Sequence, residues 1–222
     1  MNVNEIFYSI EGEGIRAGHP CVFVRFNGCN LRCSYCDTKY AQDFKAKGTE
    51  MTPREILDKV KSYGCPYVTL TGGEPCKQKK IRELVTLLCD NCFKVNVETN
   101  GSVNAAALFY GVYYRKNLTI TMDYKCKSSG MSNHMNLDYL TRLNNDDVVK
   151  FVVGSEEDMY EALRVIKALD IKLTRPNIFF SPVFGSIEPK EIVEFLKKTG
   201  LHQCRVQLQL HKFIWDPEDR GV

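Results

Sequence analysis

Short apolar segments alternate with amphipathic helical patterns along most of the chain. The segments are rich in β-branched and aromatic residues, and most are near-continuous apolar runs, as is typical of parallel strands covered on both faces. The alternation therefore predicts an α/β fold with right-handed crossovers between parallel strands. The expected strands are 21–27, 67–71, 94–98, 118–123, 148–153, 177–181 and 205–210.

Four helices are expected between these strands. The first begins with a capping box, Thr52-Pro53-Arg54-Glu55, which places proline at the first helical position. Apolar residues at helical spacing predict the others at 79–91, 156–169 and 189–198. A doubly wound sheet and a complete or incomplete barrel both fit this pattern, and both place active sites at the carboxyl ends of the strands. No linker or internal repeat divides the chain, so residues 1–222 are expected to form one domain.

Composition excludes several classes of protein. The chain is 44% hydrophobic and 26% charged, which is ordinary for a globular protein. A formal charge of +3 is too weak to indicate binding to nucleic acid or to a membrane surface. We see neither an apolar run of about 18 residues nor a signal peptide at the N-terminus. We therefore expect a cytoplasmic protein.

Three of the ten cysteines stand close together directly after the first expected strand. Cys29, Cys33 and Cys36 form a C-x3-C-x2-C run, and an ordinary [4Fe–4S] cluster takes four cysteine ligands. Three thiolates would leave one iron open to another ligand. The alternatives are a zinc site completed by a distant histidine, or three unrelated cysteines, but zinc sites usually come as C-x2-C pairs. The spacing favours the cluster.

A second motif follows the next expected strand. Thr71-Gly72-Gly73-Glu74-Pro75 is a turn whose glycines let a backbone approach a small ligand and whose carboxylate can face an ammonium. The cysteine run, with the aromatic Tyr35 inside it, and this turn together resemble the radical S-adenosylmethionine superfamily. In that superfamily S-adenosylmethionine chelates the open iron, and the reduced cluster cleaves it to a 5′-deoxyadenosyl radical.

Three further stretches resemble one family within that superfamily. They are F-Y-S-I-E-G-E-G near the start, F-V-R-F-N-G-C-N-L-R-C-S-Y-C-D-T, and Q-L-Q-L-H-K-F-I-W with a terminal R-G-V. They resemble the 7-carboxy-7-deazaguanine synthase family, and the match extends over essentially the whole chain. The resemblance implies a homodimer built on a shortened (β/α) TIM-like barrel of about six parallel strands.

The resemblance also implies a reaction. The family converts 6-carboxy-5,6,7,8-tetrahydropterin to 7-carboxy-7-deazaguanine, a step towards queuosine and other deazapurines. The adenosyl radical takes the hydrogen at C6, the ring contracts, ammonia leaves and S-adenosylmethionine is regenerated. The implied cofactors are the [4Fe–4S] cluster, S-adenosylmethionine and Mg²⁺. A flavodoxin-like protein or another reductant would supply the electron.

The resemblance also assigns roles to the residues of this chain that match the family's motifs. It implies no catalytic side chain apart from the cluster and S-adenosylmethionine. The implied metal ligands are Cys29, Cys33 and Cys36 for the cluster and Thr38 for Mg²⁺. The implied S-adenosylmethionine contacts are Ser34, Tyr35, Asp37, Gly72, Gly73, Glu74, Asp123, Tyr124, Lys125, Ser181, Pro182, Val183 and Phe184. The implied pterin contacts are Ile10, Glu11, Gly12, Glu13, Arg25, Thr71, His211 and the terminal carboxylate of Val222. Without the resemblance, Thr38 is interpreted as a turn residue and His211 as a packed histidine at the end of a strand.

Two positions depart from the family pattern. Many relatives carry glutamine where this chain has Glu11, and the family often ends in proline where this chain has Val222. The other seven cysteines, including the C-x2-C pair Cys89 and Cys92, are interpreted as packing residues or free thiols. The rival functions are a glycyl-radical-enzyme activase and, from another class, a non-enzymatic iron–sulfur or zinc protein.

Overall fold

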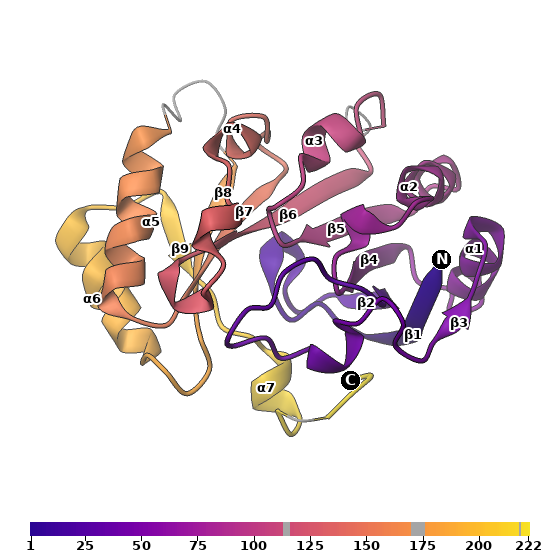
Figure 1. Cartoon of the computed structure of the whole chain (residues 1–222), viewed down its shortest axis with the longest axis horizontal. Helices are drawn as coiled ribbons and strands as arrows, with labels where there is room; N and C mark the ends of the chain where they lie inside the picture. The colour runs from indigo at the N-terminus through magenta and orange to yellow at the C-terminus, as the bar shows by residue number, and fades with distance from the viewer. Residues whose placement is uncertain (113–115, 170–175, 218) are drawn as a thin grey trace.

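Nine strands form a single sheet in the order β3-β1-β2-β4-β5-β6-β7-β8-β9. The structure, a computed structural model, describes residues 1–112, 116–169, 176–217 and 219–222 (Figure 1). Neighbouring strands from β2 to β9 pair in parallel, whereas β1 pairs antiparallel with both β2 and β3. The strands are β1 Asn2–Ile10, β2 Pro20–Phe26, β3 Thr49–Glu50, β4 Tyr67–Gly72, β5 Lys94–Thr99, β6 Leu118–Lys125, β7 Val148–Val153, β8 Asn177–Pro182 and β9 Cys204–Val206.

The predicted α/β fold is confirmed, and the sheet is open. Within the described residues β3 and β9 are its two edges, so the architecture is a partial barrel, with seven parallel strands where about six were expected. The four predicted helices are α1 Pro53–Lys61, α2 Ile81–Asp90, α5 Glu156–Ala168 and α6 Pro189–Thr199. Shorter helices are α3 Ala105–Leu108, α4 Leu137–Leu140, α7 His211–Ile214 and the 3-10 turns η1 Gly14–Arg16, η2 Lys39–Ala41, η3 Pro75–Lys77, η4 Lys127–Ser129 and η5 Ser132–His134.

The strands predicted from the sequence differ from the observed ones at β9 and β1, and the two-residue strand β3 was also not predicted. The strand expected at 205–210 ends at Val206. The backbone N–H of Gln207 still donates to the carbonyl of Phe180 on β8 (2.9 Å), but the residues after it leave the sheet, and the Gln207 side chain bonds the backbone of Gly14. Strand β1 was not predicted, since its mixture of polar and apolar residues is typical of an antiparallel strand rather than of a strand buried on both faces.

The two faces of the sheet differ in chemistry. On β2, Val22, Val24 and Phe26 are fully buried against the helices and belong to the main apolar core. The residues between them face the other way, because side chains alternate along a strand. On this inner face the parallel strands carry polar side chains, among them Thr69, Asn96 and Lys150, all buried. The inner face is therefore built for a polar site.

The connection between β1 and β2 closes the amino-terminal end of the barrel. Nη1 of Arg16 donates to the carbonyl of Lys94 at the start of β5 (2.7 Å), and Nη2 donates to Oγ1 of Thr69 on β4 (3.2 Å). In the same segment Gly14 donates its N–H to the side-chain oxygen of Gln207 (2.8 Å) and accepts from its amide nitrogen (3.0 Å). One short segment thus links β4 and β5 to the far edge of the sheet.

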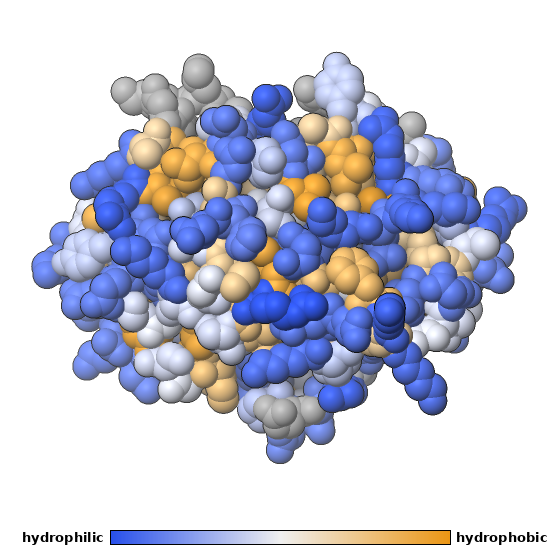
Figure 2. All heavy atoms as spheres, viewed as in Figure 1, coloured by the Kyte–Doolittle hydropathy of each residue, from blue (hydrophilic) through white to orange (hydrophobic). Residues whose placement is uncertain are grey.

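The described residues contain no helix whose length and apolar character would let it span a membrane. In Figure 2 hydrophilic side chains cover most of the visible face, and the apolar patches between them are interrupted by polar residues.

Replacing Arg16 tests the importance of this closure. Arg16→Ala removes the hydrogen bonds to Lys94 and Thr69. It also removes the longer contacts to Val68 and Glu11 (both 3.5 Å), so we expect a loss of about 2 kcal/mol in the free energy of unfolding. Urea unfolding measures it. Arg54→Ala, at an exposed position on α1, is the control and should change stability by less than about 0.5 kcal/mol. Equal stability of the two variants would show that the segment does not close the barrel.

Candidate active site

A cavity of about 1000 Å³ opens at the carboxyl ends of the parallel strands. This is large for a pocket that binds one small molecule and leaves room for more than one ligand. Its lining brings together most of the residues predicted from the sequence. They are Ile10, Glu11, Gly12, Glu13, Arg25, Cys29, Cys33, Ser34, Tyr35, Cys36, Asp37, Thr38, Thr71, Gly72, Gly73, Asp123, Lys125, Pro182, Val183, Phe184, His211 and Val222.

The three loop cysteines follow β2 and open into this cavity as free thiols. Their loop is tied to η4, where the N–H of Ser34 donates to the carbonyl of Ser129 (3.0 Å). Among the described residues, one group of three metal-binding side chains has its ligand atoms within 4.8 Å of one another, and it is Cys126, Asp158 and Glu161. Cys29, Cys33 and Cys36 do not form such a group, so at least two of their sulfurs lie more than 4.8 Å apart, whereas tetrahedral Zn–S bonds of ~2.3 Å place ligand sulfurs about 3.8 Å apart. A zinc ion held by all three would require them to move closer, and the adjacent cavity leaves room for a larger group.

The remaining cysteines lie away from the cavity. Cys21, Cys65, Cys76, Cys89 and Cys126 are buried. None of the seven lines the cavity, so no fourth cysteine faces it within the described residues.

The glycine turn after β4 packs against the cysteine loop. A Cβ on Gly73 would lie 2.3 Å from the carbonyl oxygen of Gly28, and one on Gly72, whose φ is +126°, would lie 2.2 Å from that of Phe26. The N–H of Glu74 also donates to the carbonyl of Gly28 (2.8 Å). Glycine is therefore needed at both positions because the adjacent backbone leaves no room for a Cβ. The same two glycines also line the cavity.

The sequence suggested that the Glu74 carboxylate could face an ammonium in the cavity, but Glu74 does not line the cavity. Its side chain is fully buried and accepts hydrogen bonds from the N–H groups of Cys76 (2.9 Å) and Asn100 (2.7 Å) and from Oγ1 of Thr99 (2.8 Å). A buried carboxylate needs such partners. Burial raises the pKa of Glu74, and the three donors oppose that shift. Its carboxylate joins the ends of β4 and β5 beneath the cysteine loop.

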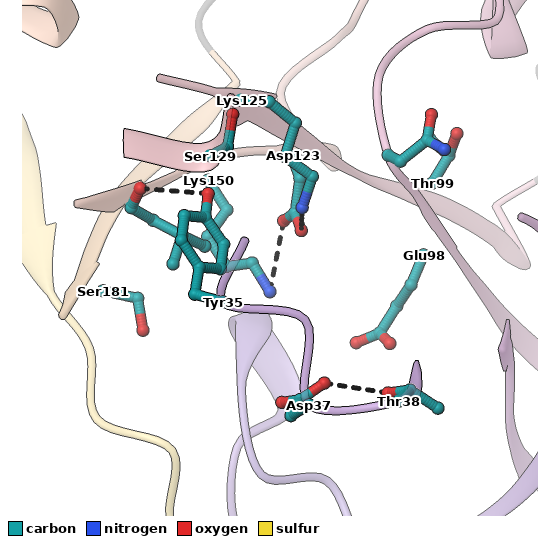
Figure 3. A network of polar contacts seen from close by, with 12 residues as sticks. Tyr35, Asp37, Thr38, Glu98, Thr99, Asp123, Lys125, Ser129, Lys150 and Ser181 are labelled. Carbon is teal, nitrogen blue, oxygen red and sulfur yellow. Dashed lines mark hydrogen bonds and ion pairs between the residues drawn. The ribbon is translucent and has the colours of Figure 1, made fainter. Parts of the chain in front are cut away.

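An ion-pair network lies along the middle strands (Figure 3). Asp123 accepts from Nζ of Lys125 (2.8 Å) and from Nζ of Lys150 (3.1 Å). Lys150 also pairs with Glu13 (3.1 Å). Burial opposes a charge on either lysine, but the neighbouring carboxylates outweigh it and raise the pKa of both. Glu13 also accepts from the hydroxyl of Ser181 (3.1 Å). Both lysines therefore stay charged at neutral pH.

A second polar group stands on the opposite wall. Nε of Arg25 donates to Oε1 of Glu5 on the paired strand (2.7 Å), and the hydroxyl of Tyr40 donates to the same oxygen (3.0 Å). The hydroxyl of Thr38 donates to Oδ1 of Asp37 (2.8 Å), and both residues line the cavity (Figure 3). A guanidinium fixed by a carboxylate is well suited to bind an anionic ligand.

Glu11 lies deep in the cavity and is 2% exposed. Its Oε2 accepts from the hydroxyl of Thr69 (2.5 Å) and lies 3.5 Å from Nη2 of Arg16. Burial, followed by the nearby carboxylate of Glu98, raises the pKa of Glu11 to about 7, although Arg16 and Thr69 counteract the shift. Close to neutral pH this carboxyl is therefore partly protonated, and its protonated form resembles a glutamine.

The carboxyl-terminal residues complete the cavity wall. The N–H of Leu210 donates to the carbonyl of Gly12 (3.1 Å), and a Cβ on Gly12 would lie 2.4 Å from Nδ1 of His211. His211 begins α7 and lines the cavity, so it is not a strand-end residue, and burial lowers its pKa. Nζ of Lys212 lies 3.6 Å from Asp37. Val222, the last residue, also lines the cavity.

Tyr124 and Ser181 are not cavity-lining residues. Tyr124 is buried on the helix side of β6, and its hydroxyl donates to Glu161 on α5 (3.3 Å). Ser181 acts on the cavity only through Glu13. The alternation of side chains along a strand makes simultaneous exposure of Asp123, Tyr124 and Lys125 impossible.

Several charged residues that line the cavity were not predicted from the sequence, and two of them, Glu98 and Lys150, belong to its polar network. Glu98 accepts from the hydroxyl of Thr71 (2.8 Å), and Lys150 lies at the centre of the ion-pair network. The sequence did contain a sign that Lys150 is buried and paired, because this lysine is a single charge inside the apolar run V-V-K-F-V-V. A lysine is almost never buried without a partner.

Comparisons with known proteins agree with this geometry. Residues 23–111 match the family model described as the radical SAM superfamily. A 7-carboxy-7-deazaguanine synthase of Clostridium acetobutylicum is 45% identical over 99% of this chain and 98% of its own length. One of Chlorobaculum tepidum is 40% identical over 100% of this chain and 97% of its own. The crystal structure of QueE from Escherichia coli superposes with a TM-score of 0.70 over 94% of this chain and 93% of its own, at 24% identity, and supports the fold.

Replacing Glu11 with glutamine tests its protonation. The pKa of Glu11 is raised from 4.5 to about 7, so the native state binds this proton more tightly than the unfolded chain. Wild-type stability should therefore fall as pH rises from about 4.5 to 7, whereas Glu11→Gln lacks this loss. The stability difference should grow in favour of the variant across that window, by at most about 3 kcal/mol. Urea unfolding at several pH values measures it, and parallel curves for the two proteins would contradict the assignment.

Proposed function

The chain belongs to the 7-carboxy-7-deazaguanine synthase family, and we propose that it makes 7-carboxy-7-deazaguanine by radical S-adenosylmethionine chemistry. Its substrate would be 6-carboxy-5,6,7,8-tetrahydropterin. The pterin loses the hydrogen at C6, its six-membered ring contracts, and ammonia leaves. The product is a deazapurine of the queuosine type.

One observation carries this proposal. Three cysteine thiols open into the same cavity as Glu13, Arg25 and the buried lysines, and no fourth cysteine faces it within the described residues. A [4Fe–4S] cluster held by Cys29, Cys33 and Cys36 would leave one iron for S-adenosylmethionine. When bound and reduced, the cluster and S-adenosylmethionine supply a 5′-deoxyadenosyl radical. An activase would need no such polar wall, because its substrate is a protein backbone.

The wall opposite the lysines suits the pterin. Arg25 is held at Nε by Glu5 and lies between the rings of Phe7 (5.8 Å) and Tyr40 (5.9 Å). A guanidinium in this position can grip the substrate carboxylate. Glu13, Glu11 and Thr71 offer oxygens to the amide-like edge of the ring, and a protonated Glu11 also offers a donor. His211 and Val222 line the same cavity and would also contact the substrate.

S-adenosylmethionine would lie against the glycine turn and the cysteine loop. Gly72 and Gly73 offer exposed backbone, and Ser34, Tyr35 and Asp37 follow the cluster ligands along the wall. Asp123 and Lys125 face the same space, while Pro182, Val183 and Phe184 supply an apolar end. The Glu74 carboxylate would not touch S-adenosylmethionine, and its role would be to hold the neighbouring backbone of Cys76 and Asn100 in place.

Magnesium belongs to the same proposal. Mg²⁺ prefers an octahedron of oxygens and retains several waters. The Thr38 hydroxyl would be one ligand, and the adjacent Asp37 carboxylate, 2.8 Å from it, is the anionic oxygen that such a site needs. Water and substrate would supply the remaining oxygens.

The rest of the proposal concerns the protein in the cell. We propose a cytoplasmic enzyme of one domain that works as a homodimer. A flavodoxin-like protein or another one-electron reductant would reduce its cluster. The weak net charge of +3 fits a small-molecule substrate better than nucleic acid.

Removing one cluster ligand should abolish activity. After anaerobic reconstitution with iron and sulfide, Cys29→Ala, Cys33→Ala and Cys36→Ala should lose most of the bound iron and form no 5′-deoxyadenosine with dithionite and S-adenosylmethionine. The control is Cys92→Ala, because Cys92 is exposed and lies outside the cavity. A loop variant with full iron content and turnover would refute the ligand assignment. Wild-type protein that forms no 7-carboxy-7-deazaguanine from the carboxytetrahydropterin would refute the function.

Replacing Arg25 should separate substrate from cofactor binding. Arg25→Ala should raise KM for the pterin by roughly 100-fold, equivalent to about 2.7 kcal/mol for a charge-assisted pair. The affinity for S-adenosylmethionine should change little. Arg25→Lys keeps the charge but loses the planar fork, so an intermediate effect is expected. Equal losses for both ligands would show that Arg25 acts only through its pairing with Glu5.

A further inference from the structure

The side chain of Asn100 reaches one of the three loop cysteines. Its Nδ2 lies 3.5 Å from Sγ of Cys29, within the range of a hydrogen bond to sulfur. Asn100 follows β5 and is buried, with 8% of its surface exposed. The backbone N–H of Leu31 donates to the same sulfur (3.4 Å). Cys29 therefore receives two N–H···S contacts.

The orientation of the Asn100 amide is set by its neighbours. Its Oδ1 accepts from the N–H (3.0 Å) and the hydroxyl (2.6 Å) of Ser102, so the nitrogen must point the other way. On that side Nδ2 meets Sγ of Cys29 and Oδ1 of Asn30 (3.2 Å). The backbone N–H of Asn100 is bonded to the buried carboxylate of Glu74 (2.7 Å). Both ends of the residue are thus fixed.

The three sulfurs are not in equal surroundings. Within the described part of the chain, the hydrogen bonds that reach a loop-cysteine sulfur all go to Cys29. Donors aimed at a ligand sulfur stabilise its negative charge, and this charge is greater when a cluster is reduced. Hydrogen bonds to the sulfurs and the residues behind the ligands are known means of setting a cluster's potential.

We propose that Asn100 is a positioning residue that raises the reduction potential of the cluster through its hydrogen bond to Cys29. The inference rests on the proposed function, because it requires a cluster on Cys29. Glu74 and Ser102 hold Asn100 in place. The carboxylate in the glycine turn thereby serves the cluster indirectly, which accounts for its burial away from the cavity.

An electrochemical measurement tests this. Wild type, Asn100→Ala and Asn100→Asp are reconstituted anaerobically, their iron is quantified, and the midpoint potential is obtained by a redox titration followed by electron paramagnetic resonance without S-adenosylmethionine. Asn100→Ala should shift the potential to more negative values. Asn100→Asp has nearly the same shape but replaces the donor with an acceptor, so its shift should be larger. At a fixed solution potential, both variants should show a smaller reduced fraction.

The matched control is Asn104→Ala. Asn104 caps the nearby helix α3 by accepting from the N–H of Ala107 (3.0 Å), and it has no hydrogen bond to a loop sulfur. Its potential should equal that of wild type. If Asn100→Ala assembles no cluster, Ser102→Ala carries the test, because it removes the hydroxyl, one of the two donors to Oδ1 of Asn100, while the backbone N–H at position 102 and the Asn100 amide remain. It should give a smaller shift in the same direction.

The outcomes separate the two proposals. Unchanged potentials in Asn100→Asp and Ser102→Ala, with wild-type iron content, overturn the role of Asn100 and leave the proposed function intact. A wild-type chain that assembles no cluster overturns the proposed function and this inference with it. An equal shift in Asn104→Ala would show that any change in this turn moves the potential, which also overturns the specific role.

Discussion

The buried side chain and backbone of Glu74 hold together the glycine turn, the end of β5 and the start of the cysteine loop. It binds the N–H groups of Cys76 and Asn100 and the hydroxyl of Thr99, while its own N–H bonds the carbonyl of Gly28. The ends of β4 and β5 and the start of the cysteine loop are therefore joined through one residue. An unpaired carboxylate at this depth would cost several kcal/mol, so these donors are required together. The glycine turn therefore positions the cysteine loop.

The polar inner face of the sheet works against stability and is tolerated because its charges are paired. Lys150 and Lys125 meet Asp123, and Glu13 meets Lys150. Replacing such networks with apolar side chains often stabilises a protein. Their presence on the face that lines the cavity is therefore better explained by ligand binding than by folding. The opposite face of the same strands carries the apolar core and supplies the stability.

The sequence was informative wherever one physical requirement dominated a segment. Strands β2 and β4 to β8 were predicted because burial on both faces demands continuous apolar runs. The grouping of the three loop cysteines at one cavity was predicted because their close spacing along the chain is typical of metal ligands. Strand β1 was missed because its side chains face two different environments: Phe7 faces the cavity, whereas Ile6 beside it packs against the apolar core. The ion pairs of Lys150 and the burial of Glu74 depend on contacts between distant segments, which spacing along the chain does not encode.

Within the described residues the two edge strands, β3 and β9, do not pair, so other segments must shield the interior of the partial barrel. Two segments far apart in the sequence do this. The β1–β2 connection crosses the amino-terminal end, where Arg16 and Gly14 bond β4, β5 and Gln207. The residues after β9 cross the other end, where Leu210 bonds Gly12. Both closures therefore involve the same segment, residues 11–16, which also carries Glu11 and Glu13 into the cavity. Because Glu11 belongs to the closure and lines the site, its protonation near pH 7 links the charge inside the cavity to the packing that closes the barrel.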